Sequence, residues 1–236
     1  MFIQYRPDVL LIAAAVLPAV ALLWLVYRAD KVEKESPRLL LRLILLGILA
    51  TVIAKALERL GLMALSSLVP PNTLAFDVLL YFGIVAFAEE GSKYFLLKKA
   101  TWNSPEFNCR FDGVVYATFI ALGFALWENI GFVLFYGFDV ALLRAVTAVP
   151  GHACFGVFMG CWYSNAKALD REGYDLGSKA ARVLALIVSA LLHGVYDFIA
   201  SSINSRNAWA FLVFITAMFI GTYLRVIWRA EEDRHI

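Results

Sequence analysis

The sequence predicts an all-α polytopic membrane protein that forms a single integral-membrane domain over residues 1–236. Hydrophobic residues make up 61% of the chain and charged residues only 17%, whereas soluble domains are about 45–50% apolar and about 25% charged. Apolar stretches long enough to cross a bilayer recur along the chain, and Lys and Arg cluster between alternate stretches. The net charge of +2 is too small to indicate a nucleic-acid partner.

Seven stretches meet the requirement for a membrane-crossing helix, which is roughly 20 mostly apolar residues. They cover residues 9–27, 39–56, 74–97, 112–136, 139–164, 181–203 and 208–227. The connections are short, so consecutive helices should be antiparallel neighbours in one bundle. The second stretch is the least certain, because residues 51–69 could lie partly along the membrane surface.

The distribution of basic residues predicts how the bundle is oriented. Fifteen Lys and Arg residues fall in or directly beside segments 28–38, 98–111, 165–182 and 225–236. The alternate segments hold only Arg6, Lys55, Arg59, Arg144 and Arg206. Because cytoplasmic loops are enriched in Lys and Arg, the N-terminus is expected outside and the C-terminus in the cytoplasm.

Small residues recur every four positions in the fourth and fifth stretches. They are Gly113, Ala117, Ala121 and Ala125, followed by Gly156 and Gly160. Such stripes let helix backbones approach closely in lipid. We therefore expect the catalytic core at approximately 74–203, with the first, second and seventh spans framing it against lipid. The run Val149-Pro150-Gly151 should bend or break the fifth span.

Five charged residues lie well inside apolar stretches, away from their ends, where each costs about 2.5–3.5 kcal/mol at mid-membrane. They are Glu89, Glu90, Lys93, Glu128 and Asp197, and Asn129, His152 and His193 lie in the same spans. Residues this costly must face the bundle interior, pair, bind an ion or contact water. Spacings of three and four residues allow either glutamate of the first pair to reach Lys93.

His193 and Asp197 are also four residues apart and share a helix face. Asp197 can accept from one imidazole nitrogen and leave the other free for a metal or water. Asp112 begins the fourth span, where a carboxylate favours the helix N-terminus. The cysteines, Cys109, Cys154 and Cys161, show neither a disulfide framework nor a CxxC metal site and are expected to be packing residues.

Two histidines and several carboxylates in a partly wet cavity fit two kinds of hydrolytic site. One is a catalytic zinc site with His152, His193 and Glu89 as ligands. The other is metal-free, with a glutamate activating water and imidazoles stabilising the oxyanion. A proton-coupled transporter or channel is a rival interpretation, although no inverted repeat is evident. A non-catalytic membrane scaffold is the third.

Five motifs in order resemble PrsW-family intramembrane proteases, which are related to the CAAX-processing and bacteriocin-processing membrane proteases. They are EExxK (89–93), FDGxxY (111–116), GFAxxEN (123–129), an isolated His152 and HxxxD (193–197). The resemblance covers about residues 74–200. It implies a multi-pass protease of the bacterial plasma membrane that cleaves membrane-anchored proteins, in some members an anti-sigma factor.

The resemblance also implies roles for individual residues. Glu89 and Glu90 would be the catalytic pair, completed by Glu128, His152 and His193. Lys93, Asn129 and Asp197 would support them. A divalent metal, zinc, is the expected cofactor, and a metal-free glutamate mechanism stays open. One departure is Phe132, where the family pattern has an aromatic residue with a hydroxyl group, so no phenol is expected to act there.

Overall fold

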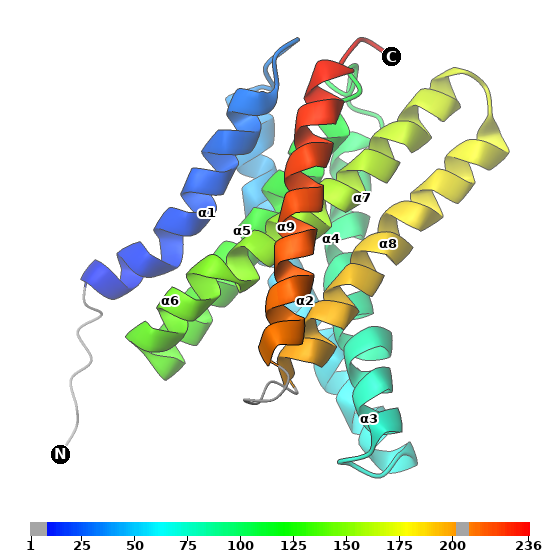
Figure 1. The fold of residues 1–236 in the computed structure, drawn as a ribbon. Coiled ribbons are helices and arrows are strands. Elements are labelled where there is room, and N and C mark those ends of the chain that lie inside the picture. Colours follow the sequence, from blue (N-terminus) through cyan, green and yellow to red (C-terminus); the bar gives the residue numbers. More distant parts are fainter. Residues whose placement is uncertain (1–8, 202–207) are drawn as a thin grey trace.

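The computed structural model describes residues 9–201 and 208–236 and confirms the all-α class (Figure 1). The helices are α1 (Val9–Ala29), α2 (Pro37–Leu68), α3 (Leu74–Val78), η1 (Leu79–Val85), α4 (Ala86–Thr101), α5 (Asp112–Tyr136), α6 (Phe138–Val146), α7 (Ala148–Arg171), α8 (Asp175–Ser201) and α9 (Ala208–Glu231). Arg6 and Arg206, which entered the count of loop charges, lie outside the described residues.

Among the described residues, six segments are long and apolar enough to cross a membrane, and they coincide with six of the seven predicted spans. The predicted span at 74–97 is divided among α3, η1 and α4, which contain five, seven and 16 residues. These three parts follow one another without a break and form one rod. The π-helical part, η1, ends just before the turn that carries Glu89 and Glu90.

Helix α2 is a single helix of 32 residues. The Ser36 hydroxyl accepts from the Leu39 N–H at 3.3 Å and Pro37 takes the first helical position, which together give a strong helix start. The expectation that α2 only frames the bundle is wrong. It packs against both α4 and α5, so its polar residues can reach the interior.

The predicted break near Pro150 occurs three residues earlier. Helix α6 ends at Val146, and α7 begins at Ala148 after Thr147 leaves the helical conformation (φ −122°, ψ −70°). Pro150 is the third residue of α7, where a missing N–H removes no intrahelical hydrogen bond. The break therefore precedes the proline and leaves His152 in the first turns of an intact helix.

The small-residue stripes bring α5 and α7 into close contact, as predicted. A Cβ atom on Gly160 would lie 2.5 Å from the Gly113 carbonyl oxygen and from the Val114 Cα. A Cβ atom on Gly156 would lie 2.9 Å from the Ala117 carbonyl oxygen. Both distances are well inside van der Waals contact, so only glycine allows these two backbones to touch.

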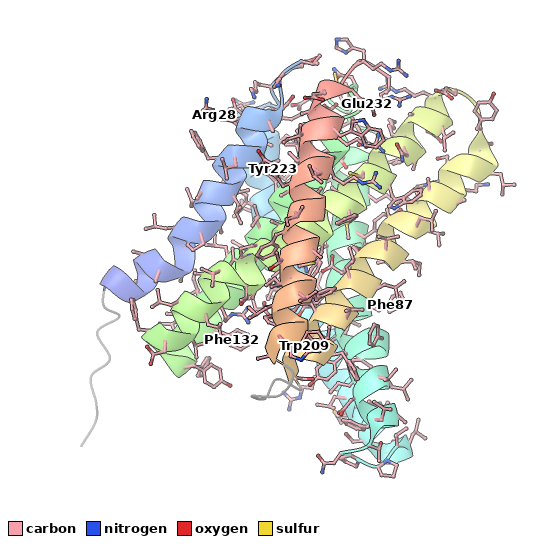
Figure 2. The ribbon with its side chains drawn as sticks, in the orientation of Figure 1. Arg28, Phe87, Phe132, Trp209, Tyr223 and Glu232 are labelled. Carbon is pink, nitrogen blue, oxygen red and sulfur yellow. The ribbon has the colours of Figure 1, made fainter. Side chains whose placement is uncertain are left out.

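The bundle exterior is apolar, as a lipid-facing surface requires. Trp209 and Tyr223 on α9 project outward (Figure 2) and are 67% and 66% exposed. Arg28 and Glu232 lie at the same end of the bundle (Figure 2). The structure thus places the end of α1 and the end of α9 on the same side, and the assignment of that side to the cytoplasm stays a prediction.

Replacing Gly160 by alanine should destabilise the protein. The added methyl group would overlap the α5 backbone, and overpacking of this kind costs about 1–3 kcal/mol. Thermal unfolding in detergent would measure the loss as a lower Tm. Gly221→Ala in α9 is the matched control, because no described heavy atom outside its own helix lies within 4 Å of the new Cβ. If both variants had the same Tm, the close α5–α7 contact would be disproved.

Candidate active site

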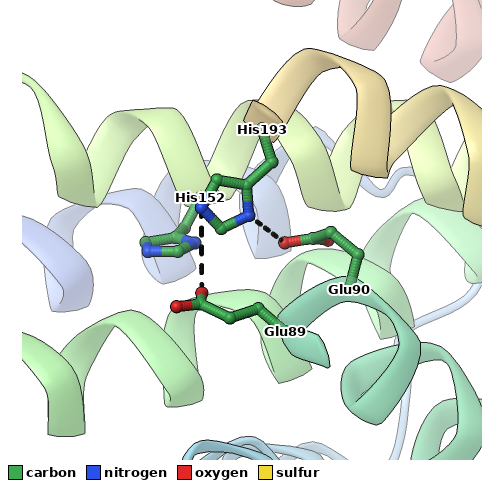
Figure 3. Close-up of side chains that lie close together, drawn as sticks. All are labelled: Glu89, Glu90, His152 and His193. Carbon is green, nitrogen blue, oxygen red and sulfur yellow. Dashed lines mark hydrogen bonds and ion pairs between the residues drawn. The ribbon is translucent and has the colours of Figure 1, made fainter. Parts of the chain in front are cut away.

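Four of the five predicted site residues converge at the centre of the bundle. Glu89 and Glu90 come from α4, His152 from α7 and His193 from α8 (Figure 3). Each is buried and offers one nitrogen or oxygen atom, and these four atoms all lie within 4.8 Å of one another. Helices separated by up to a hundred residues therefore bring two carboxylates and two imidazoles to one point.

Lys93 lies at the middle of this group and is completely buried. Its Nζ is 2.6 Å from Glu90 Oε1 and 3.5 Å from Glu89 Oε2, so both predicted ion pairs are confirmed. It also lies 3.1 Å from His152 Nδ1 and 3.9 Å from the ring centroid of Phe124. The ammonium thus supplies the positive charge that two buried carboxylates require.

His152 is held by partners on both ring nitrogens. Lys93 has only protons to donate, so Nδ1 accepts from it, and Nε2 then carries the proton that it donates to Glu128 Oε2 at 3.2 Å. The ring packs edge to face against His193 with centroids 5.2 Å apart. These contacts fix the orientation of the imidazole.

His193 contacts three carboxylates. Nδ1 lies 3.0 Å from Glu90 Oε1, and Nε2 lies 3.4 Å from Asp197 Oδ2 and 3.8 Å from Glu89 Oε2. The expected pairing of Asp197 with one imidazole nitrogen is confirmed. The expectation that the other nitrogen is free is wrong, because Glu90 reaches it from α4. Phe155 stacks on the ring at a centroid distance of 4.7 Å.

Glu128, the fifth predicted residue, lies beside this group, and its charge is balanced by basic residues other than Lys93. Arg144 of α6 donates to its Oε2 at 2.7 Å, and Lys55 of α2 approaches its Oε1 at 3.5 Å. Asn129 turns the other way, donating to the Ala15 carbonyl oxygen at 3.0 Å and accepting from Arg144. Glu128 therefore connects His152 to the two basic side chains.

A cavity of about 480 Å³ opens beside these residues. Its wall includes Glu89, Glu128, His152, His193 and Asp197. Glu90 and Lys93 are not part of the wall and lie behind it. The cavity thus exposes one glutamate of the pair and both imidazoles, whereas the second glutamate and the lysine are covered.

Known proteins resemble the chain over nearly its whole length. A family model described as PrsW family intramembrane metalloprotease matches residues 35–224. The chain belongs to the PrsW family. Protease PrsW of Oceanobacillus iheyensis is 31% identical over 222 residues, covering 94% of this chain and 95% of the relative. No solved structure matches the chain significantly.

Two further relatives with the same name are similar to most of the chain. Protease PrsW of Bacillus subtilis is 31% identical over 199 residues, covering 83% of this chain and 84% of the relative. Protease PrsW of Clostridioides difficile is 29% identical over 224 residues, covering 93% and 87%. The chain is therefore a peptidase and a multi-pass protein of the bacterial cell membrane.

Two basic residues of the site, Lys55 and Arg144, were not predicted from the sequence. They were counted only as basic residues of the connecting segments, yet both line the cavity. Lys55 lies 3.3 Å from Glu89 Oε1 and pairs with Glu128 as well. The available signal was its position one residue before the end of the apolar stretch at 39–56, in a helix that continues to Leu68.

Removing the buried ammonium should destabilise the protein strongly. Lys93→Met leaves two buried carboxylates without their shared cation, and breaking a buried ion pair by removing one partner costs about 3–5 kcal/mol. The apparent Tm in detergent measures this effect. Lys98→Met, on the exposed end of the same helix, should change stability by no more than about 0.5 kcal/mol. Equal Tm values for the two variants would show that Lys93 does not balance the cluster.

Proposed function

We propose that this protein hydrolyses peptide bonds in membrane-anchored proteins with a water molecule that Glu89 activates. One observation carries the proposal. Glu89 borders the cavity, and its Oε2 is buried with no hydrogen-bond partner among the described residues. No hydrogen bond occupies this oxygen, whose charged neighbours are the Lys93 ammonium at 3.5 Å and His193 Nε2 at 3.8 Å, so it can accept a proton from water as a general base does.

Glu90 has a different role in this proposal. Its Oε1 is occupied by Lys93 and by His193 Nδ1, and it does not border the cavity. Glu90 would therefore position His193, while Glu89 moves protons. The resemblance treats the two glutamates as one catalytic pair, and the contacts of this chain suggest how they divide the work.

The proposed reaction proceeds as follows. Glu89 takes a proton from water, and the water oxygen bonds to the carbonyl carbon of the peptide. The negative charge that develops on the carbonyl oxygen meets positive charge in the cavity wall, where Lys55, Arg144 and the imidazoles lie. The C–N bond then breaks, and Glu89 returns the proton to the departing amine.

The donor set suits a divalent metal. Two imidazoles and a carboxylate are the ligands of many catalytic zinc sites, and Glu90 Oε2, like Glu89 Oε2, is buried without a hydrogen-bond partner in the described part of the chain. His152, His193 and Glu90 would hold zinc, which would polarise the carbonyl group and acidify bound water. This proposal moves the carboxylate ligand from Glu89 to Glu90. The Lys93 ammonium would have to withdraw, because it would repel the ion.

The surroundings of the cavity support a substrate that arrives within the membrane. A groove of about 330 Å³ between α2 and α5 shares Lys55, Glu128 and Phe132 with the cavity. Trp127 and Phe135 line the groove and are 49% and 85% exposed. An apolar transmembrane segment could enter here from the lipid. We propose a single-span anti-sigma factor as the substrate and residues 74–203 as the catalytic core.

Replacing Glu89 by glutamine should abolish cleavage of a co-expressed single-span anti-sigma factor. The amide cannot accept the proton, and loss of a general base lowers rates about 10²–10⁴-fold. Immunoblotting for the released fragment measures cleavage. Glu172→Gln, at the exposed turn between α7 and α8, is the control and should cleave like the wild type. Cleavage by Glu89→Gln at the wild-type rate would overturn the proposal.

Metal analysis of the purified protein tests the proposed zinc ligands. We expect His152→Ala and His193→Ala each to lose about one ion per chain relative to the wild type, because the remaining ligands bind weakly. Glu172→Gln should keep the full content. The same metal content in all four proteins would contradict histidine ligation and leave the metal-free glutamate mechanism.

A further inference from the structure

A second group of metal-binding side chains lies at the end of the bundle where α1 and α9 end (Figure 1). Here the segment after α9 docks on the loop that precedes α5. The Arg110 N–H donates to the Arg234 carbonyl oxygen at 3.1 Å, and the Ile236 N–H donates to the Asn108 carbonyl oxygen at 2.7 Å. These bonds form the isolated antiparallel bridge that sets Cys109 opposite His235.

The bridge brings a thiol and an imidazole together beside a carboxylate. Cys109 Sγ lies 3.3 Å from His235 Nδ1. Glu33, from the connection between α1 and α2, supplies an oxygen, and the three atoms all lie within 4.8 Å of one another. Cys109 is only 1% exposed, whereas Glu33 and His235 are exposed. Three segments distant in the sequence thus each contribute one ligand atom.

The distances suit tetrahedral zinc. Ligand atoms bound at about 2.0–2.3 Å from a tetrahedral zinc ion lie about 3.3–3.6 Å from one another. A bound sulfur and nitrogen would be about 3.5–3.6 Å apart, so the observed 3.3 Å needs only a small adjustment, and the glutamate is on an exposed, adjustable side chain. Thiolate and imidazole together select zinc over magnesium or calcium, which prefer oxygen ligands alone.

Acidic side chains lie around the group. Asp30 is 1% exposed, and neither of its carboxylate oxygens has a hydrogen-bond partner in the described ranges. Asp112 Oδ1 and Asp233 Oδ2 are likewise buried and without such a partner among residues 9–201 and 208–236. Asp30, Glu33, Asp112 and Asp233 all act electrostatically on the Cys109 sulfur. Burying carboxylates without donors is costly, and a bound cation would offset that cost.

A hydrogen bond between thiol and imidazole would account for Cys109 and His235 alone. The Asn108 side-chain amide donates to Glu33 Oε2 at 3.1 Å and holds this carboxylate beside the pair. A cation would bind all three ligand atoms at once, so the metal interpretation accounts for more of the observed arrangement.

We propose that Glu33, Cys109 and His235 bind a zinc ion, with water in the fourth position. This site is separate from the Glu89–His193 cluster and shares no residue with it. The ion would fasten the segment after α9 to the loop that begins α5. That loop is the one whose N–H groups at Asn108 and Cys109 bind Asp112 at 2.8 and 2.6 Å.

Cobalt substitution separates this site from the active site. A Co²⁺ ion bound by thiolate gives a sulfur-to-metal charge-transfer absorption band, and the Glu89–His193 cluster contains no sulfur. The full-length protein, purified in detergent with its tag at the N-terminus, should show the band after loading with Co²⁺. Cys109→Ser should lose the band and about one ion per chain. Cys154→Ser, a buried cysteine outside both metal-binding groups, should keep both.

His235→Ala provides a second test that does not disturb the buried core, because His235 is exposed. We expect it to weaken Co²⁺ binding at this site by at least tenfold in a titration followed at the charge-transfer band. Gel filtration would confirm that each variant is folded. If the wild type showed no band, or if Cys109→Ser retained the wild-type band and metal content, the proposed site would be disproved.

Discussion

The structure depends on neutralising charge in the apolar interior of the helix bundle. Four carboxylates face the cavity or lie directly behind it, namely Glu89, Glu90, Glu128 and Asp197. Three basic side chains form ion pairs within this group, namely Lys55, Lys93 and Arg144. Each helix that contributes a charged side chain to the group is held in the position where that charge has a partner. A buried charge without a partner would cost several kcal/mol.

Close backbone packing makes this arrangement possible. Ion pairs with N–O distances of 2.6–3.5 Å break if the helices move apart by a small distance. Lipid gives no hydrophobic drive for the helices to associate. Glycine contacts between α5 and α7 provide the required proximity through van der Waals packing. The ion pairs at the centre therefore depend on the glycine contacts between α5 and α7, which hold the helices close enough for the pairs to form.

The sequence was sufficient to predict the all-α bundle, the interior position of the charged residues and the internal ion pairs of α4. These follow from length, apolarity and helical spacing, which are local properties. It could not show that Lys55 and Arg144 turn inward, because the partners of a basic residue near a span end depend on how helices cross. The contact of Glu90 with His193 and the joining of Cys109, His235 and Glu33 were missed for the same reason.

The π-helical segment η1 has a consequence for how this site can vary. A π-helix accommodates more residues per turn than the α-helix that follows it, so Leu79–Val85 sets the rotational phase with which α4 begins. Loss of one residue there would turn α4 by about 100° about its axis and direct Glu89 away from the cavity. Insertions and deletions should therefore be tolerated in the connection at 69–73 but selected against between η1 and Lys93, where Tyr81 and Val85 of η1 also border the cavity.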